Sequence, residues 1–477
     1  MSELTELFRN AIDLNRYSNG VSLRLVRVWN DAVLDVVEQL QLLEDLDRSA
    51  KAVRLRSILA QLKESLDTWA GTSTLAMTEE LQGLAVLQSE FVARELRRAL
   101  PENLRRQIRD VQISPDFARS VATVDPTAIN VVSLSDDLQA AVTGAPRATF
   151  QLTAAQGTAI TLPNGKVLEK SFRGLAESQA ELFAKTVRNG LLTGESPDKI
   201  ARRLKGRLRF GQRGSVRQMA QAGGEATAVA NNQVMALVRT SVNQVANAAS
   251  QQTYQANQDV TQKYRYIATL DGKTSPICRS LDGRVFEYGK GPTPANPPHF
   301  GCRSTTVPVI DYAGASKRFG IDIPPPSSKI GYRPTKEGTP SSADPKGGRV
   351  PVGTSAAQHL YDLRGTTKAG RKSRFEASPA QARMLNGGKA TPGAFEKARY
   401  FNRLADRYGP EGAMKRFMRE DGQEVSLQEL RRRYKDPEKI TQGKKAAAPK
   451  PKPKPRAKPK PAPVPKPEQI SPDVQRS

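Results

Sequence analysis

The sequence predicts a mainly α-helical protein that carries a small, turn-rich α+β module and ends in a disordered basic tail. Three observations support this fold class. Apolar residues recur at helical spacing through residues 1–125. Residues 264–312 are dense in glycine and proline and hold both cysteines of the chain. Proline alternates with lysine or arginine through residues 449–460, a pattern that favours an extended, solvated strand.

The length of 477 residues allows about two to four domains. Apolar residues make up 38% of the chain and aromatic residues 6%, and there are 33 prolines. This mixture is lean for a chain that is globular throughout, so part of the length is expected to be linker or tail.

The charge balance favours a polyanionic partner. Lys and Arg number 74 against 48 Asp and Glu, giving a formal net charge of +26. Such a field strengthens non-specific, salt-sensitive binding to nucleic acid. The alternative is a solvated surface that keeps the protein soluble. Nucleic acid is the favoured partner, because an excess of basic residues is typical of proteins that bind nucleic acid.

Two cysteines are too few for a disulfide scaffold. The chain opens with no cationic and apolar signal segment, and no run approaches the roughly eighteen apolar residues that span a bilayer. The protein is therefore expected to be made and kept in a reducing cytoplasm, without a membrane partner.

Residues 1–125 are predicted to form antiparallel helices, the first of which is short and ends at Asn19-Gly20. Packing of their apolar faces against the chain's own core is favoured over docking on a partner. The predicted seams comprise Val26, Trp29, Val33, Val36, Leu40 and Leu43, then Leu55, Leu59, Leu62, Leu66 and Trp69, then Leu81, Leu84, Leu87 and Phe91.

Residues 160–168 resemble a β-hairpin, with Asn164-Gly165 supplying the positive φ angles of a tight turn. Ser196 can cap a further helix whose first residue is Pro197. An Ala/Asn/Gln-rich helix is predicted over residues 225–257, and its small residues suit close helix packing. Tyr264, Tyr266 and Ile267 then indicate a strand.

The C-terminal part is expected to comprise a linker, a small basic helical unit and the disordered tail. The helical unit contains a helix with Phe395, Phe401 and Tyr408 on one face, and a shorter helix over residues 427–434. The tail is expected to neutralise DNA phosphates without reading bases. Its candidate DNA-binding residues are Lys450, Lys452, Lys454, Arg456, Lys458 and Lys460.

Cys278, His299 and Cys302 form a candidate metal-ligand set. Thiolate and imidazole ligands suit zinc, which takes four ligands in a structural site. The fourth would be Asp271, Asp282 or water. The set is incomplete, so zinc is a hypothesis.

Three other interpretations of these residues are open. In the first, the cysteines are small buried residues and the histidine is hydrogen-bonded in its loop; the incomplete ligand set favours this interpretation over zinc. A Cys278–Cys302 disulfide is disfavoured by a reducing cytoplasm. A cysteine nucleophile with His299 as its base lacks an evident third group and oxyanion hole. The sequence also contains no Walker phosphate loop and no His-Glu metalloprotease motif, so no enzyme activity and no other cofactor are predicted.

The segment around the cysteines combines turn-forming and ligand residues in a fixed order: Asp271, Thr274, Pro276, Cys278, Leu281-Asp282-Gly283, Pro297-Pro298-His299 and Cys302-Arg303. This order resembles the signature of the phage Mu F-like minor head proteins. Val238-Arg239-Thr240 and the Gly194-to-Pro197 segment are also similar to that family. The specific likeness is confined to about residues 190–310, and the helices before it fit the family as well.

The sequence departs from the family pattern at three positions. Ser275 stands where many members have a second cysteine, and Ser304 replaces the last cysteine of a Cys-Arg-Cys group. Both changes remove candidate metal ligands. Pro298 also runs directly into His299, where the family has one residue between.

The resemblance implies a minor capsid protein that acts in phage head morphogenesis. Such proteins occur in few copies per head, associate with the portal, and assist procapsid assembly or DNA passage. The implied partners are the portal protein, the capsid or procapsid, and double-stranded DNA bound non-specifically. The implied location is the virion, inside the capsid, after assembly in the host cytoplasm.

Two other classes of function compete with this one. A non-structural or ejected DNA-binding protein would have much the same charge distribution. A toxin-like enzyme appended to a head protein is less favoured, because residues 345–440 lack a recognisable acidic catalytic pair in a Gly-rich frame.

The expected organisation follows from these interpretations. The predicted parts are a helical N-terminal region at 1–125, a connecting region with the hairpin at 126–189, the Mu F-like module at 190–322, a linker at 323–360, the basic helical region at 361–440 and the disordered tail at 441–477.

Overall fold

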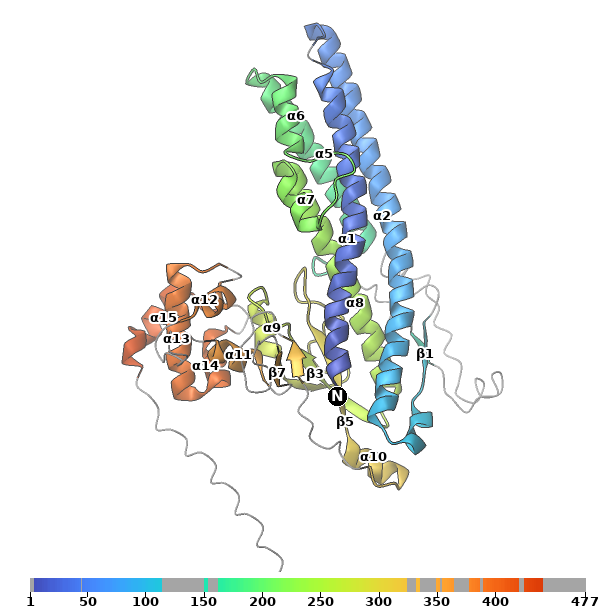
Figure 1. The fold of residues 1–477 in the computed structure, drawn as a ribbon, viewed down its shortest axis with the longest axis vertical. Coiled ribbons are helices and arrows are strands. Elements are labelled where there is room, and N and C mark those ends of the chain that lie inside the picture. Colours follow the sequence, from blue (N-terminus) through green and yellow to red (C-terminus); the bar gives the residue numbers. More distant parts are fainter. Residues whose placement is uncertain are drawn as a thin grey trace, which may run out of the picture.

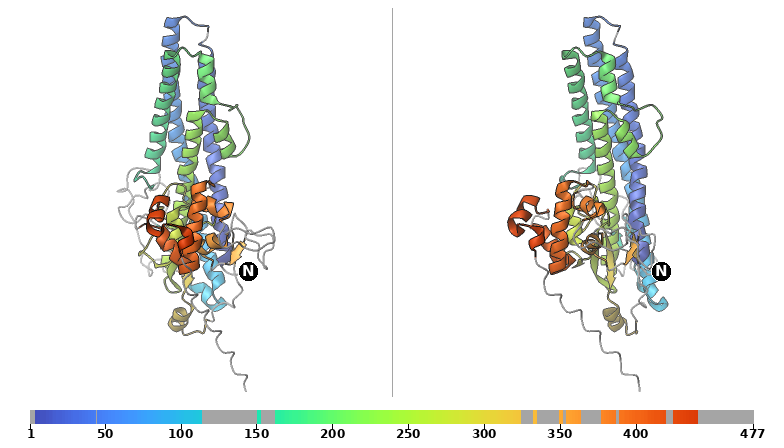
Figure 2. Two further views of the ribbon diagram at one scale, coloured as in Figure 1. Left: turned by 90° about the vertical axis from the view of Figure 1, so that its left-hand side faces the viewer. Right: turned by 60° about the vertical axis from the view of Figure 1, so that its left-hand side comes forward.

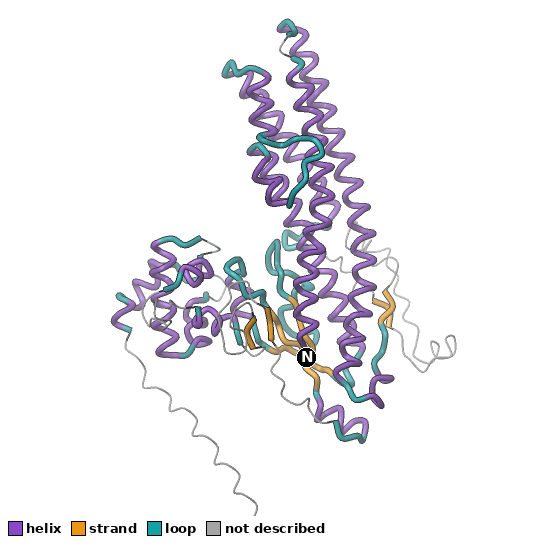
Figure 3. Tube along the Cα trace, viewed as in Figure 1, coloured by secondary structure: helices purple, strands orange, loops and turns teal. Residues whose placement is uncertain are grey.

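The protein is a long helical stalk on a small base that contains the strands (Figure 1). Figure 3 shows the same division by colour, with helix running the length of the stalk and strands confined to its lower part. The mainly helical fold class is confirmed. The computed structural model describes residues 4–43, 45–113, 150–152, 162–323, 332–334, 349–351, 354–363, 377–386, 389–419 and 424–440.

Four helices build the stalk: α1 (Leu4–Gln41), α2 (Arg48–Ala99), α5 (Leu168–Leu192) and α8 (Glu225–Ala256). Two shorter helices, α6 (Pro197–Lys205) and α7 (Val216–Ala222), lie along its upper half (Figure 1). The core contains an aromatic chain from three of the long helices. Trp69 lies edge-on to Trp29 and to Phe172, with ring centroids 4.6 and 5.4 Å apart.

The predicted helix end at Asn19-Gly20 is wrong, because α1 continues unbroken to Gln41. A glycine inside a helix costs about 1 kcal/mol relative to alanine. The residues around it offset that cost, since Ser18, Val21 and Ser22 are all buried in the stalk. Tertiary packing therefore overrides the local signal for a helix end.

The predicted hairpin at residues 160–168 is also wrong. A turn forms there, closed by a backbone hydrogen bond of 2.9 Å from Leu162 to Lys166, but Gly165 at φ +72° has a positive φ and Asn164 does not. No strand flanks the turn within described residues 162–167, and α5 begins directly at Leu168. Leu168 is fully buried in the stalk core, so helix packing determines the conformation on that side.

Several predicted helix and strand positions are confirmed. Ser196 accepts a hydrogen bond from the backbone of Lys199, and Pro197 is the first residue of α6. The Ala/Asn/Gln-rich segment forms α8. Tyr264, Tyr266 and Ile267 lie in β3 (Thr261–Ile267).

The base contains an antiparallel sheet with the order β4–β3–β5, in which β4 spans Val285–Glu287 and β5 spans Thr305–Ile310. Helix α9 (Pro276–Leu281) connects β3 to β4, and α10 (Tyr312–Phe319) follows β5. The remaining elements of the base are η1 (Glu102–Gln107) and the parallel pair β1 (Val111–Ile113) and β2 (Phe150–Leu152).

A separate helical unit packs beside the base, as the two views of Figure 2 show. It has its own apolar core, in which Phe401 and Phe417 meet edge-on at 5.5 Å. Its elements are α11 (Ala356–Asp362), α12 (Pro379–Leu385), α13 (Pro392–Tyr408), α14 (Pro410–Phe417), α15 (Leu427–Tyr434) and η3 (Pro437–Lys439). We call this group the C-terminal unit.

The segment predicted as linker, residues 323–360, contains regular structure. Strand β6 (Tyr332–Pro334) pairs with β7 (Arg349–Pro351), and α11 starts at Ala356. The tail at 441–477 lies outside the described residues. Among the helices that the structure describes, none has the length and apolar character needed to cross a membrane.

Candidate metal centre

Helix α9 positions Cys278 next to the sheet. Ser275 caps this helix by accepting a hydrogen bond of 3.2 Å from the backbone of Cys278, and Pro276 begins it. These two residues are the preferred types at their positions. The sulfur of Cys278 lies 3.4 Å from the hydroxyl of Tyr266 on β3, and Cys278 is only 2% exposed.

Cys302 is positioned by α8 through the loop that precedes β5. The side-chain amide of Asn243 donates to the backbone oxygen of Ser304 at 2.9 Å. The hydroxyl of Thr240 accepts from the backbone of Gly301 at 2.8 Å. Gly301 has φ +69°, a conformation that glycine adopts without strain. Cys302 is fully buried as a result.

His299 completes the group and is oriented by its own loop. Its Nδ1 lies 2.9 Å from the backbone oxygen of Phe300, so Nδ1 carries the proton and donates. The lone pair of Nε2 then faces the sulfur of Cys278, which is 3.3 Å away. Carbonyl-oriented histidines of this kind are typical of metal ligands.

Two of the three separations between the ligand atoms are close to those of a tetrahedral zinc site. A zinc ion with ordinary bond lengths separates two sulfurs by about 3.8 Å and a sulfur from a nitrogen by about 3.6 Å. The observed distances are 3.9 Å between the two sulfurs and 3.3 Å from the Cys278 sulfur to Nε2. All three atoms lie within 4.8 Å of one another. The sequence-predicted set therefore assembles into a group that could bind a metal ion.

The two carboxylates considered for the fourth position are engaged elsewhere. Asp271 pairs with Arg303 at 2.7 Å. Asp282 accepts backbone hydrogen bonds from Ala268 at 2.7 Å and from Ala356 at 2.6 Å. Water remains a candidate for the fourth ligand.

The two serines that replace family cysteines both lie at the cluster. The hydroxyl of Ser275 is 2.7 Å from Nε2 of His299. Ser304 interacts with both thiols, since its hydroxyl is among the groups that lower the pKa of each. The fourth corner thus has a hydroxyl beside it where the family has a sulfur.

Electrostatic interactions favour the thiolate form of Cys278, and the thiolate is the form that binds metal ions. The hydrogen bond from the Cys302 thiol is the main cause that lowers the pKa of Cys278 to about 3, against the opposing effect of burial. The same bond, reinforced by burial, raises the pKa of Cys302. The bond to Cys278 likewise raises the pKa of His299. Cys278 is therefore the thiolate of the pair, and the thiolate is the form that binds metals.

The geometry also disfavours two of the other interpretations of this cluster, the disulfide and the cysteine nucleophile. The cysteines are free thiols, and 3.9 Å between sulfurs is far beyond the bond length of about 2.05 Å in a disulfide. A nucleophile at Cys278 is disfavoured, because so little of this residue is accessible to a substrate. The simple packing interpretation stays open, since both cysteines also lie in an apolar cluster with Tyr266 and Leu281.

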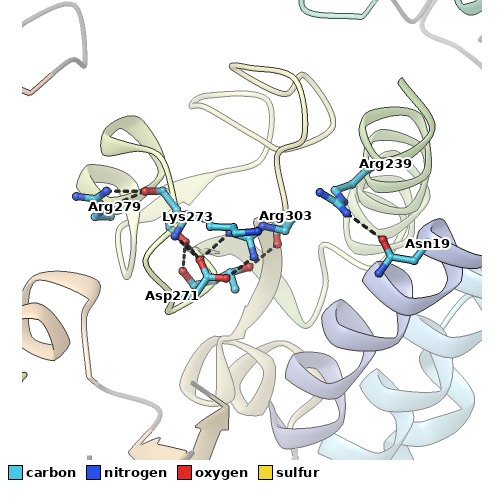
Figure 4. A network of polar contacts seen from close by, with 8 residues as sticks. Asn19, Arg239, Asp271, Lys273, Arg279 and Arg303 are labelled. Carbon is cyan, nitrogen blue, oxygen red and sulfur yellow. Dashed lines mark hydrogen bonds and ion pairs between the residues drawn. The ribbon is translucent and has the colours of Figure 1, made fainter. Parts of the chain in front are cut away.

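A polar network fixes the turn beside the cluster (Figure 4). Asp271 accepts from the guanidinium of Arg303 and from the backbone of Lys273 at 2.9 Å. Burial raises the pKa of Asp271, but the hydrogen bond and charge of Arg303 outweigh it, so the pKa is lowered overall. On the other side of the network, Arg239 of α8 donates to Asn19 of α1 at 2.9 Å. The first group of contacts fixes the turn before α9, and the Arg239–Asn19 contact joins the stalk helices α8 and α1 beside it.

Sequence reasoning missed Arg279, which connects the cluster to the C-terminal unit. Its guanidinium donates to the backbone oxygen of Thr274 at 2.7 Å and pairs with Glu424 at 2.6 Å. The side chains of Arg279 and Glu424 are 2% and 12% exposed. No local signal could have shown this pair, because its members are 145 positions apart. The predicted DNA-binding residues Lys450 to Lys460 lie outside the described residues.

These features define a structural class: a helical stalk joined to a sheet module that is closed by a Cys-His-Cys cluster. Residues 181–307 match the family of phage Mu protein F like proteins. The match runs from within α5 into β5 and includes all three candidate ligands. The match supports a phage head-morphogenesis protein, and the resemblance seen in the sequence is confirmed over this region. No curated protein and no solved structure matches the chain.

Proposed function

We propose that the protein is a minor capsid protein that associates with the portal or the procapsid and contacts packaged DNA through basic regions. The observation that carries this proposal is the family match over residues 181–307, which contains α8 and the whole Cys/His cluster. In this proposal the stalk and the module dock on the portal or shell inside the capsid. The C-terminal unit and its basic tail face the interior, and the protein acts as a structural component without enzyme activity.

Exposed apolar side chains near the stalk tip support a docking role. Leu42, just after α1, is 71% exposed, and Leu192, the last residue of α5, is 85% exposed. Val53 in the first turns of α2 is 65% exposed. The end of α1 lies beside the start of α6, which follows α5, because the side chain of Gln41 donates to Asp198 of α6 at 2.7 Å. Apolar groups concentrated at one end of a molecule indicate a contact with another protein.

We further propose that Cys278, His299 and Cys302 bind a zinc ion, with water or Ser275 as the fourth ligand. The zinc would fix α9 and the loop before β5 against the sheet, which is a structural role. Two ligand separations close to those of a zinc site, together with the carbonyl-oriented histidine, support this proposal over simple packing.

The proposed association can be tested by recovering the tagged protein from infected cells and identifying its partners by mass. We expect portal or major capsid protein at a fixed ratio to the full-length chain. The double variant Leu42→Asp and Leu192→Asp should reduce that ratio at least about tenfold, because it places charge in an apolar contact. The matched control is Leu75→Asp with Leu87→Asp, which alters exposed leucines along the side of α2.

Recovery of neither portal nor capsid protein with the full-length chain would contradict the proposal. Recovery of DNA alone would favour the rival interpretation, a DNA-binding protein that is no structural subunit. Equal ratios for the tip variant and its control would show that docking uses another surface.

A further inference from the structure

The loop between α6 and α7 concentrates positive charge on the side of the stalk. Residues 205–217 contain five cations, Lys205, Arg207, Arg209, Arg213 and Arg217, and no carboxylate. Figure 2 shows this loop in green, standing out from the bundle in both views. The four arginines are all exposed.

These four guanidinium groups have no acidic partner in the part of the chain that the structure describes. Their neighbours in α6 differ in this respect, since Arg202 pairs with Asp198, and Arg203 pairs with Glu195 at 2.9 Å. Unpaired guanidinium groups keep their full charge available for an incoming anion. The loop is therefore a cationic surface that the protein does not neutralise itself.

Much of the positive charge of the C-terminal unit is already used within the unit. Arg399 and Arg403 share Glu438 at 2.6 and 2.9 Å. Arg431 pairs with Glu396 at 2.6 Å. Pairing therefore distinguishes these arginines from those of the α6–α7 loop.

Contacts fix both ends of the loop, so the positions of its arginines on the stalk are defined. The backbone of Arg207 donates to Ala222 at 2.6 Å, and Leu208 is buried at 3% exposure. A Cβ at Gly224 would lie 2.0 Å from the backbone oxygen of Arg203, so only glycine allows this close approach. At the other end, Ser215 begins α7 with a complete capping box.

The cationic surface continues onto α1. A cavity of about 260 Å³ is lined by Arg27 of α1 together with Arg209 and Arg213 of the loop. Asp31 is the acidic residue in this lining. Burial, and then the neighbouring Asp35, raise the pKa of Asp31, so its carboxylate is more easily protonated beside an anion.

We propose that the α6–α7 loop binds the phosphodiester backbone of double-stranded DNA through Arg207, Arg209, Arg213 and Arg217. Guanidinium groups bind phosphate oxygens in pairs of hydrogen bonds, and contacts of this kind carry no base specificity. An acidic protein partner fits less well. Protein interfaces need a buried apolar centre, and among the loop side chains that the structure describes Phe210, 46% exposed, is the one large apolar group on the surface. This inference deepens the DNA contact of the proposed function by naming a second site.

The test measures duplex DNA affinity of the full-length protein by fluorescence anisotropy across a salt series. The loop variant changes Arg207, Arg209, Arg213 and Arg217 to glutamine. Each phosphate contact adds about 0.9 to the slope of log K against log salt. We expect the loop variant, which removes four contacts, to lower that slope by about 3.6 and the affinity at 0.1 M salt by more than about tenfold.

Three full-length variants control for total charge, folding and the tail. The first removes four other exposed stalk cations, through Arg54→Gln, Arg56→Gln, Lys63→Gln and Lys185→Gln, and should leave the slope nearly unchanged. The second changes the same four loop arginines to lysine and should retain most of the slope. The third replaces the six tail cations, Lys450, Lys452, Lys454, Arg456, Lys458 and Lys460, by glutamine.

The outcomes separate this inference from the proposed function. An unchanged slope in the loop variant would overturn the inference, while a flattened slope in the tail variant would still support DNA contact. Equal effects of the loop variant and the stalk-charge control would also overturn it, since charge alone would then be responsible. Loss of portal or capsid recovery from the loop variant with DNA affinity intact would assign the loop to an acidic protein instead.

Discussion

Replacement of Cys302 by alanine is expected to abolish metal binding and to destabilise the base of the protein. The wild-type chain should contain about one zinc per molecule, and the variant should contain almost none. Cys302 is buried and supplies one of three assembled ligands, so two ligands would remain. Structural zinc sites contribute folding free energy directly, and the loss should amount to several kcal/mol. Elemental analysis and thermal unfolding measure the two effects.

The replacement Ser275→Cys should have the opposite effect on zinc affinity. The Ser275 hydroxyl already lies 2.7 Å from Nε2 of His299, so a sulfur there would supply the fourth ligand of a complete site. Competition with a chelator should show tighter binding than in the wild type. If purified wild-type protein contains no metal and Ser275→Cys gains none, the cysteines are simple packing residues.

Arg279→Ala is expected to weaken the attachment of the C-terminal unit by about 3 kcal/mol, because breaking a buried ion pair leaves an uncompensated charge. Among the described residues, Glu424 would keep Lys397 as its cationic partner, 3.3 Å away. The backbone oxygen of Thr274 would also lose its donor. Urea unfolding and the rate of proteolysis between the base and the C-terminal unit would measure the change.

The double variant Arg279→Met with Glu424→Met tests the cause. Removal of both charges leaves no buried ion unpaired, so much of the lost stability should return. Lys290→Ala, which removes an exposed pair with Glu287, serves as the control and should have no measurable effect. A loss of stability in the double variant as large as in Arg279→Ala would show that the ion pair does not hold the unit in place.

The helices of the stalk could be predicted from apolar spacing, but their ends could not. Gly20 signals a helix end locally, yet its neighbours are buried in the stalk, and α1 continues through it. A turn forms at Asn164-Gly165 with a positive φ at Gly165 alone, and burial of Leu168 made the following residues helical. In both cases long-range packing, which the local sequence does not show, decided the outcome.

The three candidate ligands could be predicted because thiol and imidazole groups are rare in this chain, with two cysteines and two histidines. The residues around them could not. Nothing in the sequence indicated that the amides of Asn243 and Asn247 in α8 hold the backbone oxygen of Ser304. Nor could the net charge of +26 show which arginines are paired with acids and which, like Arg209, are free for another partner.

Quantitative mass spectrometry of purified proheads and mature virions tests the central claim most directly. We expect this polypeptide in both particles at a fixed, low copy number relative to the major capsid protein, at a constant ratio to the portal. Its absence from both particles, in a host that expresses it during infection, would contradict the assignment to head assembly.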